Sequence, residues 1–191
     1  MSVPENLKKD RSDLVAYWSV PLADGIYTIE FEHGTTSGKR ILRVNGQEII
    51  RREWMFKLVG NEKFKIGKQE AKCELHVDPL PYFAFGYSLI VDGKPLEKFT
   101  ENQNKAMKSW AIVLDGQRYR IILEKQTLDV WLNGEKIEVE HAFAKDGTEI
   151  NFLVDENQIS IKASTAAKKE GVIHQLFINN NLIEEENEFQ E

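Results

Sequence analysis

Few groups in this sequence stand where they could do covalent or nucleotide chemistry. The run Gly34–Lys39 looks like a phosphate-binding loop. That motif needs four residues between its glycines and a Ser or Thr after the lysine, whereas here three residues intervene and Arg40 follows. The segment also leads into a predicted strand, so no helix N-terminus would be present to hold phosphate. We therefore interpret the segment as a loop between two strands, and we expect no cofactor.

The histidines and the cysteine do not form a metal-binding or catalytic set. The four histidines are scattered, and none has a second histidine at zinc-ligand spacing. Cys73 alternates with Leu75 and Val77, which is typical of a small core residue. A reactive thiolate needs a nearby cation or a helix N-terminus, and the sequence indicates neither there. We expect no metal and no catalytic residue, and therefore no enzyme activity.

Carboxylates offer the remaining route to catalysis. The chain has 31 Asp and Glu residues, but no pair is set apart by its position. A glycosidase needs two carboxyl groups facing each other across a cleft, and spacing in the sequence does not exclude that arrangement. A carbohydrate-binding or carbohydrate-active protein therefore stays open as the alternative function. Such a site would show a concave sheet face with exposed aromatic side chains beside carboxylates.

Composition excludes several classes of partner. The net charge of −6 argues against nucleic acid, because such binding depends on Lys and Arg neutralising phosphates. It argues against an anionic membrane surface for the same reason. No run approaches the roughly 18 apolar residues of a membrane-spanning helix, so we expect no membrane insertion. One cysteine allows no intrachain disulfide, which favours a reducing compartment and a cytoplasmic location.

The chain reads as two copies of one unit. Three segments recur in the same order: 18–32 as 110–124, 42–49 as 130–137, and 89–97 as 176–184. Turn dipeptides such as Asn45-Gly46 and Asn133-Gly134 recur with them, and these favour two-residue hairpins. The middles of the copies align poorly, and the hairpin at Phe64–Gly67 is expected to lack a counterpart in the second copy.

Alternating apolar and polar residues predict strands throughout. Tyr27, Ile29 and Phe31 alternate with polar residues, and residues 119–123 repeat the pattern. Because no window combines a helical apolar stripe with caps, we predict an all-β protein with an antiparallel β-sandwich or a β-barrel in each copy. The predicted boundaries are a polar N-terminal extension at 1–13, β domains at 14–100 and 110–184, a linker at 101–109, and an acidic tail at 185–191.

The tryptophans divide into packing and contact candidates. Trp18 and Trp110 occupy matching repeat positions, and we expect them, like Trp54, to lie in a core. Trp131 differs, because its neighbours Val130 and Leu132 should face the other side of the strand. If those neighbours are buried, Trp131 faces outward and is a candidate contact residue.

Several long runs resemble the Fas apoptotic inhibitory molecule family. They are residues 24–40, 52–60, 122–125, 129–134 and 169–174, and the resemblance extends from about residue 14 to residue 183. It implies that the two domains are tandem antiparallel β-sandwiches, and it implies a cytosolic, non-catalytic protein that opposes death-receptor-induced apoptosis and suppresses protein aggregation. The N-terminal extension looks longer than in the short family form, and the tail after residue 183 is more acidic than the family leads us to expect.

We therefore hypothesise a binding protein that acts as a holdase without ATP, through edge-strand pairing and exposed aromatic side chains. Its expected partners are other proteins, either death-receptor pathway components or misfolded clients, and the chain itself is expected to be a monomer or a weak homodimer. The candidate contact residues are Trp131 and the loop residues His33, Gly34, Thr35, Thr36, Ser37 and Gly38.

Overall fold

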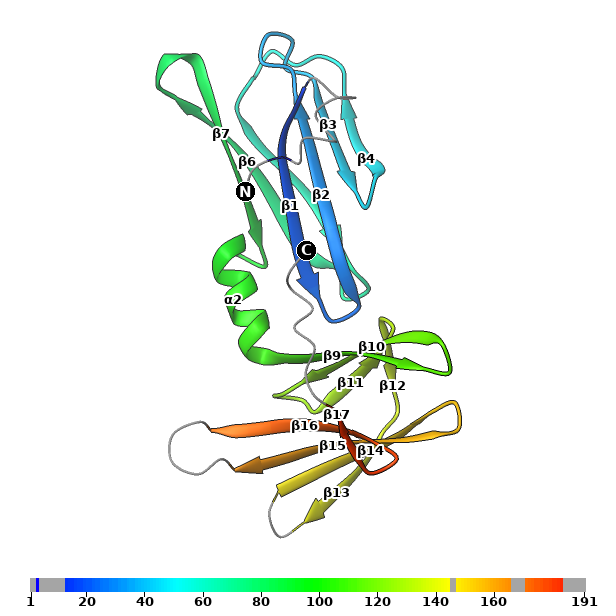
Figure 1. Cartoon of the computed structure of the whole chain (residues 1–191). Coiled ribbons are helices and arrows are strands. Elements are labelled where there is room, and N and C mark those ends of the chain that lie inside the picture. Colours follow the sequence, from blue (N-terminus) through cyan, green and yellow to red (C-terminus); the bar gives the residue numbers. More distant parts are fainter. Residues whose placement is uncertain (1–2, 4–12, 145–146, 166–170, 184–191) are drawn as a thin grey trace. The chain divides into compact units, whose positions relative to one another are not determined.

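Each copy of the repeat forms its own pair of antiparallel sheets. The computed structural model describes residues 3, 13–144, 147–165 and 171–183 (Figure 1). The chain divides into two compact units, Met1–Gln103 and Asn104–Glu191. Apart from residues 3 and 13, the predicted N-terminal extension lies outside the described residues, as does the acidic tail. No described helix is long and apolar enough to cross a membrane.

The N-terminal domain packs two four-stranded sheets face to face. One sheet has the order β1 (Leu14–Leu22), β2 (Gly25–His33), β3 (Arg40–Val44), β4 (Gln47–Arg52), and the other β5 (Gly60–Ile66), β6 (Ala71–Leu80), β7 (Ala84–Val91), β8 (Lys94–Pro95), with a 3-10 turn at Pro81–Phe83. Alternate residues of each strand face inward, as the period of two requires. The buried cluster between the sheets includes Trp18, Phe31, Leu42, Leu75 and Val91.

The C-terminal domain repeats this plan with one strand more. Its sheets are β9 (Met107–Leu114), β10 (Gln117–Glu124), β11 (Asp129–Leu132), β12 (Glu135–Ile137), and β13 (Glu140–Ala144), β14 (Gly147–Val154), β15 (Asn157–Thr165), β16 (Val172–Ile178), β17 (Asn181–Ile183). Trp110, Ile121, Val130, Ile161 and Leu176 are among its core residues. The predicted fold class, all-β with two tandem antiparallel sandwiches, is confirmed.

The repeat extends to individual hydrogen bonds. Asn45 and Asn133 each follow the third strand of their copy with a φ of +49°. The side-chain oxygen of Asn45 accepts from the amide of Thr28, and that of Asn133 from the amide of Arg120, both at 2.8 Å. The turns after β7 and β16 use an Asp and an Asn in the same way. Asn and Asp tolerate this left-handed backbone better than most residues, which explains why they recur at these turns.

Two expectations from the sequence are wrong. The β5–β6 hairpin does have a counterpart in the second copy, β14–β15, and the additional strand is β13. The sequence also predicted no helix, but residues 96–106 form helix α2 (Leu96–Ala106), which overlaps the predicted linker. Its first turn buries Leu96 and Phe99 against the N-terminal core. Two buried side chains thus stabilise a helix whose sequence is otherwise polar, because tertiary packing outweighs a weak helical pattern.

Candidate protein-interaction site

Three connections meet at one end of the N-terminal domain. They join β2 to β3 (residues 34–39), β4 to β5 (residues 53–59) and β6 to β7 (residues 81–83) (Figure 1). Antiparallel pairing brings the end of β2 beside the start of β3 and the end of β4. Side-chain contacts between the two sheets, His33 with Tyr87 and Arg40 with Glu62, place the β6–β7 turn at the same end.

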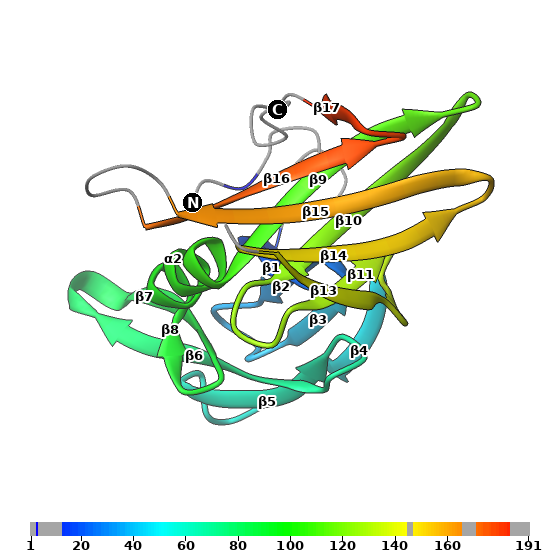
Figure 2. The same cartoon turned by 90° about the horizontal axis from the view of Figure 1, so that it is seen from below.

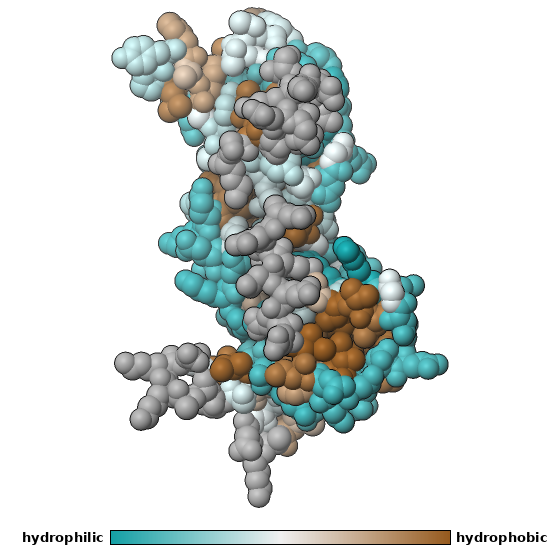
Figure 3. Space-filling view, viewed as in Figure 1, coloured by the Kyte–Doolittle hydropathy of each residue, from teal (hydrophilic) through white to brown (hydrophobic). Residues whose placement is uncertain are grey.

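Two of these connections expose large aromatic side chains. The exposed fractions are 57% for Trp54, 91% for Phe56, 98% for Tyr82 and 101% for Phe83. The Trp54 and Phe56 rings lie edge to face, with centroids 4.1 Å apart. Apolar surface gathers at the tip of the β6–β7 hairpin (Figure 3). The two aromatic pairs lie on separate connections at the same end of the domain, and exposed apolar groups of this kind are typical of a protein-contact surface. We call these four residues the aromatic end.

The backbone under Tyr82 and Phe83 is strained. Their φ angles are +63° and +59°. Bulky side chains rarely adopt this left-handed region, which costs on the order of 1–3 kcal/mol per residue. The turn therefore holds both rings in solvent at an energetic cost, and such strain concentrates at functional sites.

The β2–β3 loop supports the segment that carries Trp54 and Phe56. The amide of Met55 donates to the carbonyl of Ser37 at 3.0 Å. Gly38 has a φ of +69°, and a Cβ there would lie 2.3 Å from the Met55 carbonyl oxygen. Only glycine permits both the backbone conformation and this approach.

A buried charge cluster holds the other end of the same segment. Arg40, with 2% of its side chain exposed, donates to Glu62 at 3.0 Å and to the carbonyl of Leu58 at 3.1 Å. Arg52 also reaches Glu62, with nitrogen–oxygen distances of 3.3 and 3.4 Å. The guanidinium of Arg40 thus connects the core to the segment just after Phe56. Its Nε has no partner in the described structure.

His33 connects the two sheets next to this cluster. Its Nδ1 lies 2.9 Å from the Tyr87 hydroxyl, and its ring centroid lies 5.0 Å from that of Phe85. Burial lowers the pKa of His33, and the positive charge of Arg40 lowers it further. The imidazole is therefore neutral at pH 7. It packs as a core side chain at the base of the β6–β7 hairpin.

The predicted contact loop, residues 33–38, mainly supports the segment that carries Trp54 and Phe56. His33 and Gly38 are buried, Gly34 and Ser37 are partly buried, and Thr35 and Thr36 are exposed. The loop closes on itself through Gly34, whose amide donates to Lys39 and whose carbonyl accepts from Gly38. Only its two threonines are well placed to touch another molecule.

Trp131 is not the exposed ring that the sequence indicated. Its neighbour Val130 is in the core, so the ring does face the other side of the sheet. Only 6% of it is exposed, however. Its pairing partner on β10 is the buried Ile122, and its indole N–H donates to Glu124 at 3.0 Å. Alternation gives the side of a sheet but not whether that side is covered.

The tryptophan that is exposed is Trp54, which the sequence placed in a core. Trp18 and Trp110 are buried, as expected. The sequence did carry a signal, because Trp54-Met55-Phe56 has no strand alternation and follows charged Arg52-Glu53. The pair Tyr82-Phe83 follows two prolines, at 79 and 81, which also argues against an interior strand.

Burial shifts the pKa of two further candidate groups, the thiol of Cys73 and the imidazole of His174. Cys73 is buried in the core, and desolvation raises the pKa of its thiol to about 12. Burial also lowers the pKa of His174. Within the described ranges, no three His, Cys, Asp or Glu side chains gather as metal ligands would.

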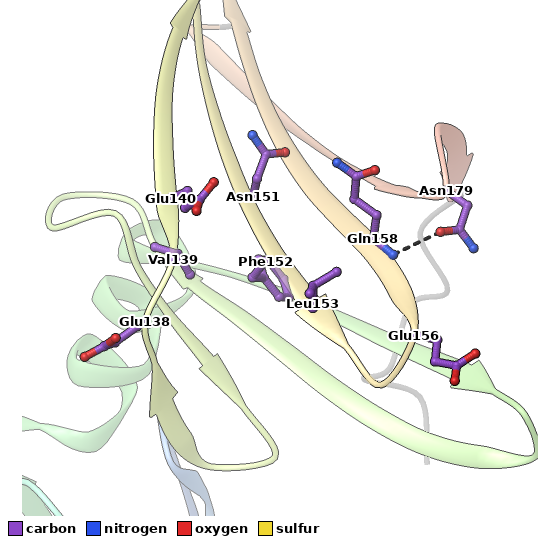
Figure 4. A pocket seen from close by; sticks show the side chains of 9 residues that line it. All are labelled: Glu138, Val139, Glu140, Asn151, Phe152, Leu153, Glu156, Gln158 and Asn179. Carbon is purple, nitrogen blue, oxygen red and sulfur yellow. Dashed lines mark hydrogen bonds between the residues drawn. The ribbon is translucent and has the colours of Figure 1, made fainter.

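The C-terminal domain carries a groove of about 930 Å³ on its five-stranded sheet (Figure 4). Its polar lining residues are Glu138, Glu140, Asn151, Glu156, Gln158 and Asn179. Its aromatic lining residue, Phe152, is only 7% exposed and belongs to the core. The groove thus supplies carboxylates without an exposed ring beside them, so it gives the carbohydrate alternative only half of the expected arrangement.

Fold and site together define a tandem β-sandwich protein with an exposed aromatic end. The family model described as Fas apoptotic inhibitory molecule (FAIM1) matches residues 14–186. The chain is 48% identical to Fas apoptotic inhibitory molecule 1 of Bos taurus, over 96% of this chain and 92% of the relative. It is 50% identical to that of Mus musculus and 47% to that of Homo sapiens, over 91% of this chain and 98% of each relative. The chain belongs to the Fas apoptotic inhibitory molecule family.

Proposed function

We propose that this chain is a non-enzymatic cytoplasmic protein that restrains death-receptor-induced apoptosis and the aggregation of other proteins through direct protein–protein contacts. The aromatic end of the N-terminal domain is the contact surface. The observation that carries the proposal is the exposure of Trp54, Phe56, Tyr82 and Phe83 on loops fixed by buried groups. The names of the relatives support the link to Fas-dependent apoptosis.

Rigid aromatic rings are the side chains most often responsible for binding energy at protein interfaces. They bury a large apolar area and lose little conformational entropy. The Met55–Ser37 and Arg40–Leu58 hydrogen bonds hold the backbone of residues 55–58 in place. An exposed apolar segment of a misfolded client, or an apolar patch on a signalling protein, is therefore a suitable partner.

The test is light scattering of reduced, aggregating insulin with increasing amounts of the intact protein. We expect suppression by the native chain and a loss of at least about thirtyfold in potency for Trp54→Ser/Phe56→Ser, since one aromatic anchor contributes roughly 2 kcal/mol and the variant removes two. The matched control is Ile26→Ser, because Ile26 is 47% exposed in the β1–β2 hairpin, at the other end of the same domain.

The same variants should be expressed in cells exposed to Fas ligand, with caspase activation as the readout. The native chain and Ile26→Ser should delay activation, and the double variant should not. If the double variant suppresses aggregation and caspase activation as well as the native chain, the aromatic end is not the contact surface. If the native chain does neither, the proposed function itself is wrong.

A further inference from the structure

The two copies differ at the edge strand that begins each one. Among the described residues, β1 and β9 both lie at the end of their sheets and pair with one neighbour only. Trp18 of β1 corresponds to Trp110 of β9, so three residues later Pro21 corresponds to Val113. An unpaired edge presents backbone N–H and C=O groups to other chains, and proteins commonly protect edges with proline, charge or bulges.

The backbone of β9 presents such groups on its outer side. The N–H of Arg120 donates to the Asn133 side chain at 2.8 Å, and its C=O accepts from the Asn133 amide at 2.9 Å. Both groups of Arg120 therefore point toward β11. Its pairing partner on β9 is Ala111, which must then direct its own N–H and C=O away from β10. By the same alternation, so must Ser109 and Val113.

These groups have no hydrogen-bond partner in the described part of the chain. The stretch from residue 109 to 114 contains no charge, and 63% of Val113 is exposed. The β9–β10 hairpin also extends beyond strand β11, because β11 pairs only with the later part of β10 (Figure 2). The edge is thus long, uncharged and accessible at Val113.

The equivalent edge of the first copy is protected. Thr28 turns its N–H and C=O toward Asn45, so its partner Ser19 faces outward, and Pro21 does likewise. Proline has no N–H to offer, and it is tolerated at this position because β2 does not need one there. The register of β1 is further broken by an irregularity between Leu14 and Ala16. Val113 restores the donor that the first copy lacks.

We propose that residues 109–113 of β9 bind an extended segment of another protein by β-strand addition, and that this segment carries carboxylates next to apolar residues. Backbone pairing supplies the binding energy, and Val113 offers an apolar contact. Arg118 pairs directly with Val113 on the same face of the sheet and is exposed. It lies one strand further in than the edge, and its long cationic side chain attracts an acidic side chain on the added strand. The inference rests on the proposed function, because the bound segment is a client or signalling partner.

A second copy of this chain is a poorer occupant. Pairing of two β9 strands over five residues would bury far less than the roughly 1,000 Å² that a stable interface requires. It would also bring together two chains that each carry a net charge of −6. A separate acidic segment is attracted by Arg118 and does not need an interface of that size.

The experiment is fluorescence anisotropy of a labelled peptide, Glu-Val-Glu-Val-Glu-Val with blocked ends, titrated with the full-length chain. Its carboxylates fall on one face of a strand. We expect Val113→Pro, which copies the first domain, to weaken binding about tenfold, since it removes one backbone hydrogen bond and crowds the edge. Val113→Thr keeps the N–H and should bind nearly as well as the native chain. Arg118→Glu should weaken the acidic peptide and strengthen its lysine counterpart.

Amide exchange supplies a second measurement. Bound peptide should slow the exchange of the Ala111 and Val113 amides, which face the added strand, and leave Ile112, which faces β10, unchanged. No binding by the native chain, or equal binding by the native chain and a folded Val113→Pro variant, would overturn the proposal. Concentration-dependent dimerisation that Val113→Pro abolishes would also overturn it, since it would assign the edge to a second copy.

The outcome is separable from that of the proposed function. If the native chain suppresses client aggregation but does not bind the peptide, the edge inference fails and the proposed function stands. If it binds the peptide through β9 but has no effect on aggregation or caspase activation, the edge inference stands and the proposed function fails.

Discussion

The guanidinium group of Arg40 donates to a carboxylate oxygen of Glu62 at 3.0 Å, between the two sheets of the N-terminal domain. Both side chains are buried, with 2% and 6% of their surfaces exposed. Glu62 also faces Arg52, whereas the other partner of Arg40 is the carbonyl of Leu58. Without Arg40, Glu62 would therefore keep a cationic partner, whereas without Glu62, Arg40 would keep only a neutral carbonyl.

We expect Glu62→Ala to destabilise the N-terminal domain by about 3–5 kcal/mol, because it leaves Arg40 buried without a counter-charge. Arg40→Met should cost less, since Glu62 keeps Arg52. Urea unfolding followed by tryptophan fluorescence measures both values. The ranking is the test, and a larger loss for Arg40→Met would show that the Leu58 hydrogen bond, not the charge pair, dominates.

Stability should fall as the pH drops from about 7 to about 5. Burial, and next the charge of Arg40, lower the pKa of His33 in the folded state. The unfolded imidazole keeps a pKa near 6.5, so below that value the unfolded chain binds more protons and is favoured. Urea unfolding at pH 7.5, 6.5 and 5.5 measures the trend. His33→Gln should flatten it for the N-terminal domain, and a stability that is constant or rises toward acid would contradict the assignment.

Two glycine substitutions separate backbone strain from steric clash. Gly46→Ala meets no atom within 4 Å, but its φ of +78° is unfavourable for alanine, so a loss of about 1–2 kcal/mol is expected. Gly38→Ala adds a clash with the Met55 carbonyl and should cost at least twice as much. It should also displace Trp54, which a shift in fluorescence emission or faster proteolysis of residues 53–59 would reveal. Equal losses at both sites would mean that the β2–β3 loop does not fix the aromatic segment.

Trp131 should behave as a core residue. We expect Trp131→Ala to cost about 3–5 kcal/mol, as large deletions at buried aromatic sites do. Trp131→Phe should lose only about 1–2 kcal/mol, which reflects the indole N–H to Glu124 and a smaller ring. Thermal unfolding of the full chain measures both. A stability change below about 0.5 kcal/mol for the alanine variant would restore the surface assignment.

The thiol of Cys73 should be nearly inert in the folded protein. With its pKa raised to about 12, almost none of it is thiolate at pH 8. Iodoacetamide should modify it only after urea unfolds the N-terminal domain. N-acetylcysteine in the same buffer is the control, and rapid modification of the native chain would show that the site opens without unfolding.

The sequence by itself determined that the chain is built of strands and tight turns and that its unit is repeated in tandem. Alternation at Tyr27, Ile29 and Phe31 specifies which side chains of a strand face the core, because side chains of a strand repeat every two residues. Asn45 and Asn133 mark turns whose backbone few other residues tolerate. These constraints are local, so they can be recognised in a single sequence.

Only the tertiary structure decided which surfaces are free. Alternation placed Trp131 on an outer face, yet that face is covered, and Trp54 lies in a segment that reaches solvent. Helix α2 formed because Leu96 and Phe99 found a core to pack against. The support of residues 55–58 by Ser37 and Arg40 joins positions 18 residues apart along the chain. Which sheet faces are covered, and which loops are held by distant residues, depends on how two sheets and their loops pack. No local sequence pattern encodes that packing.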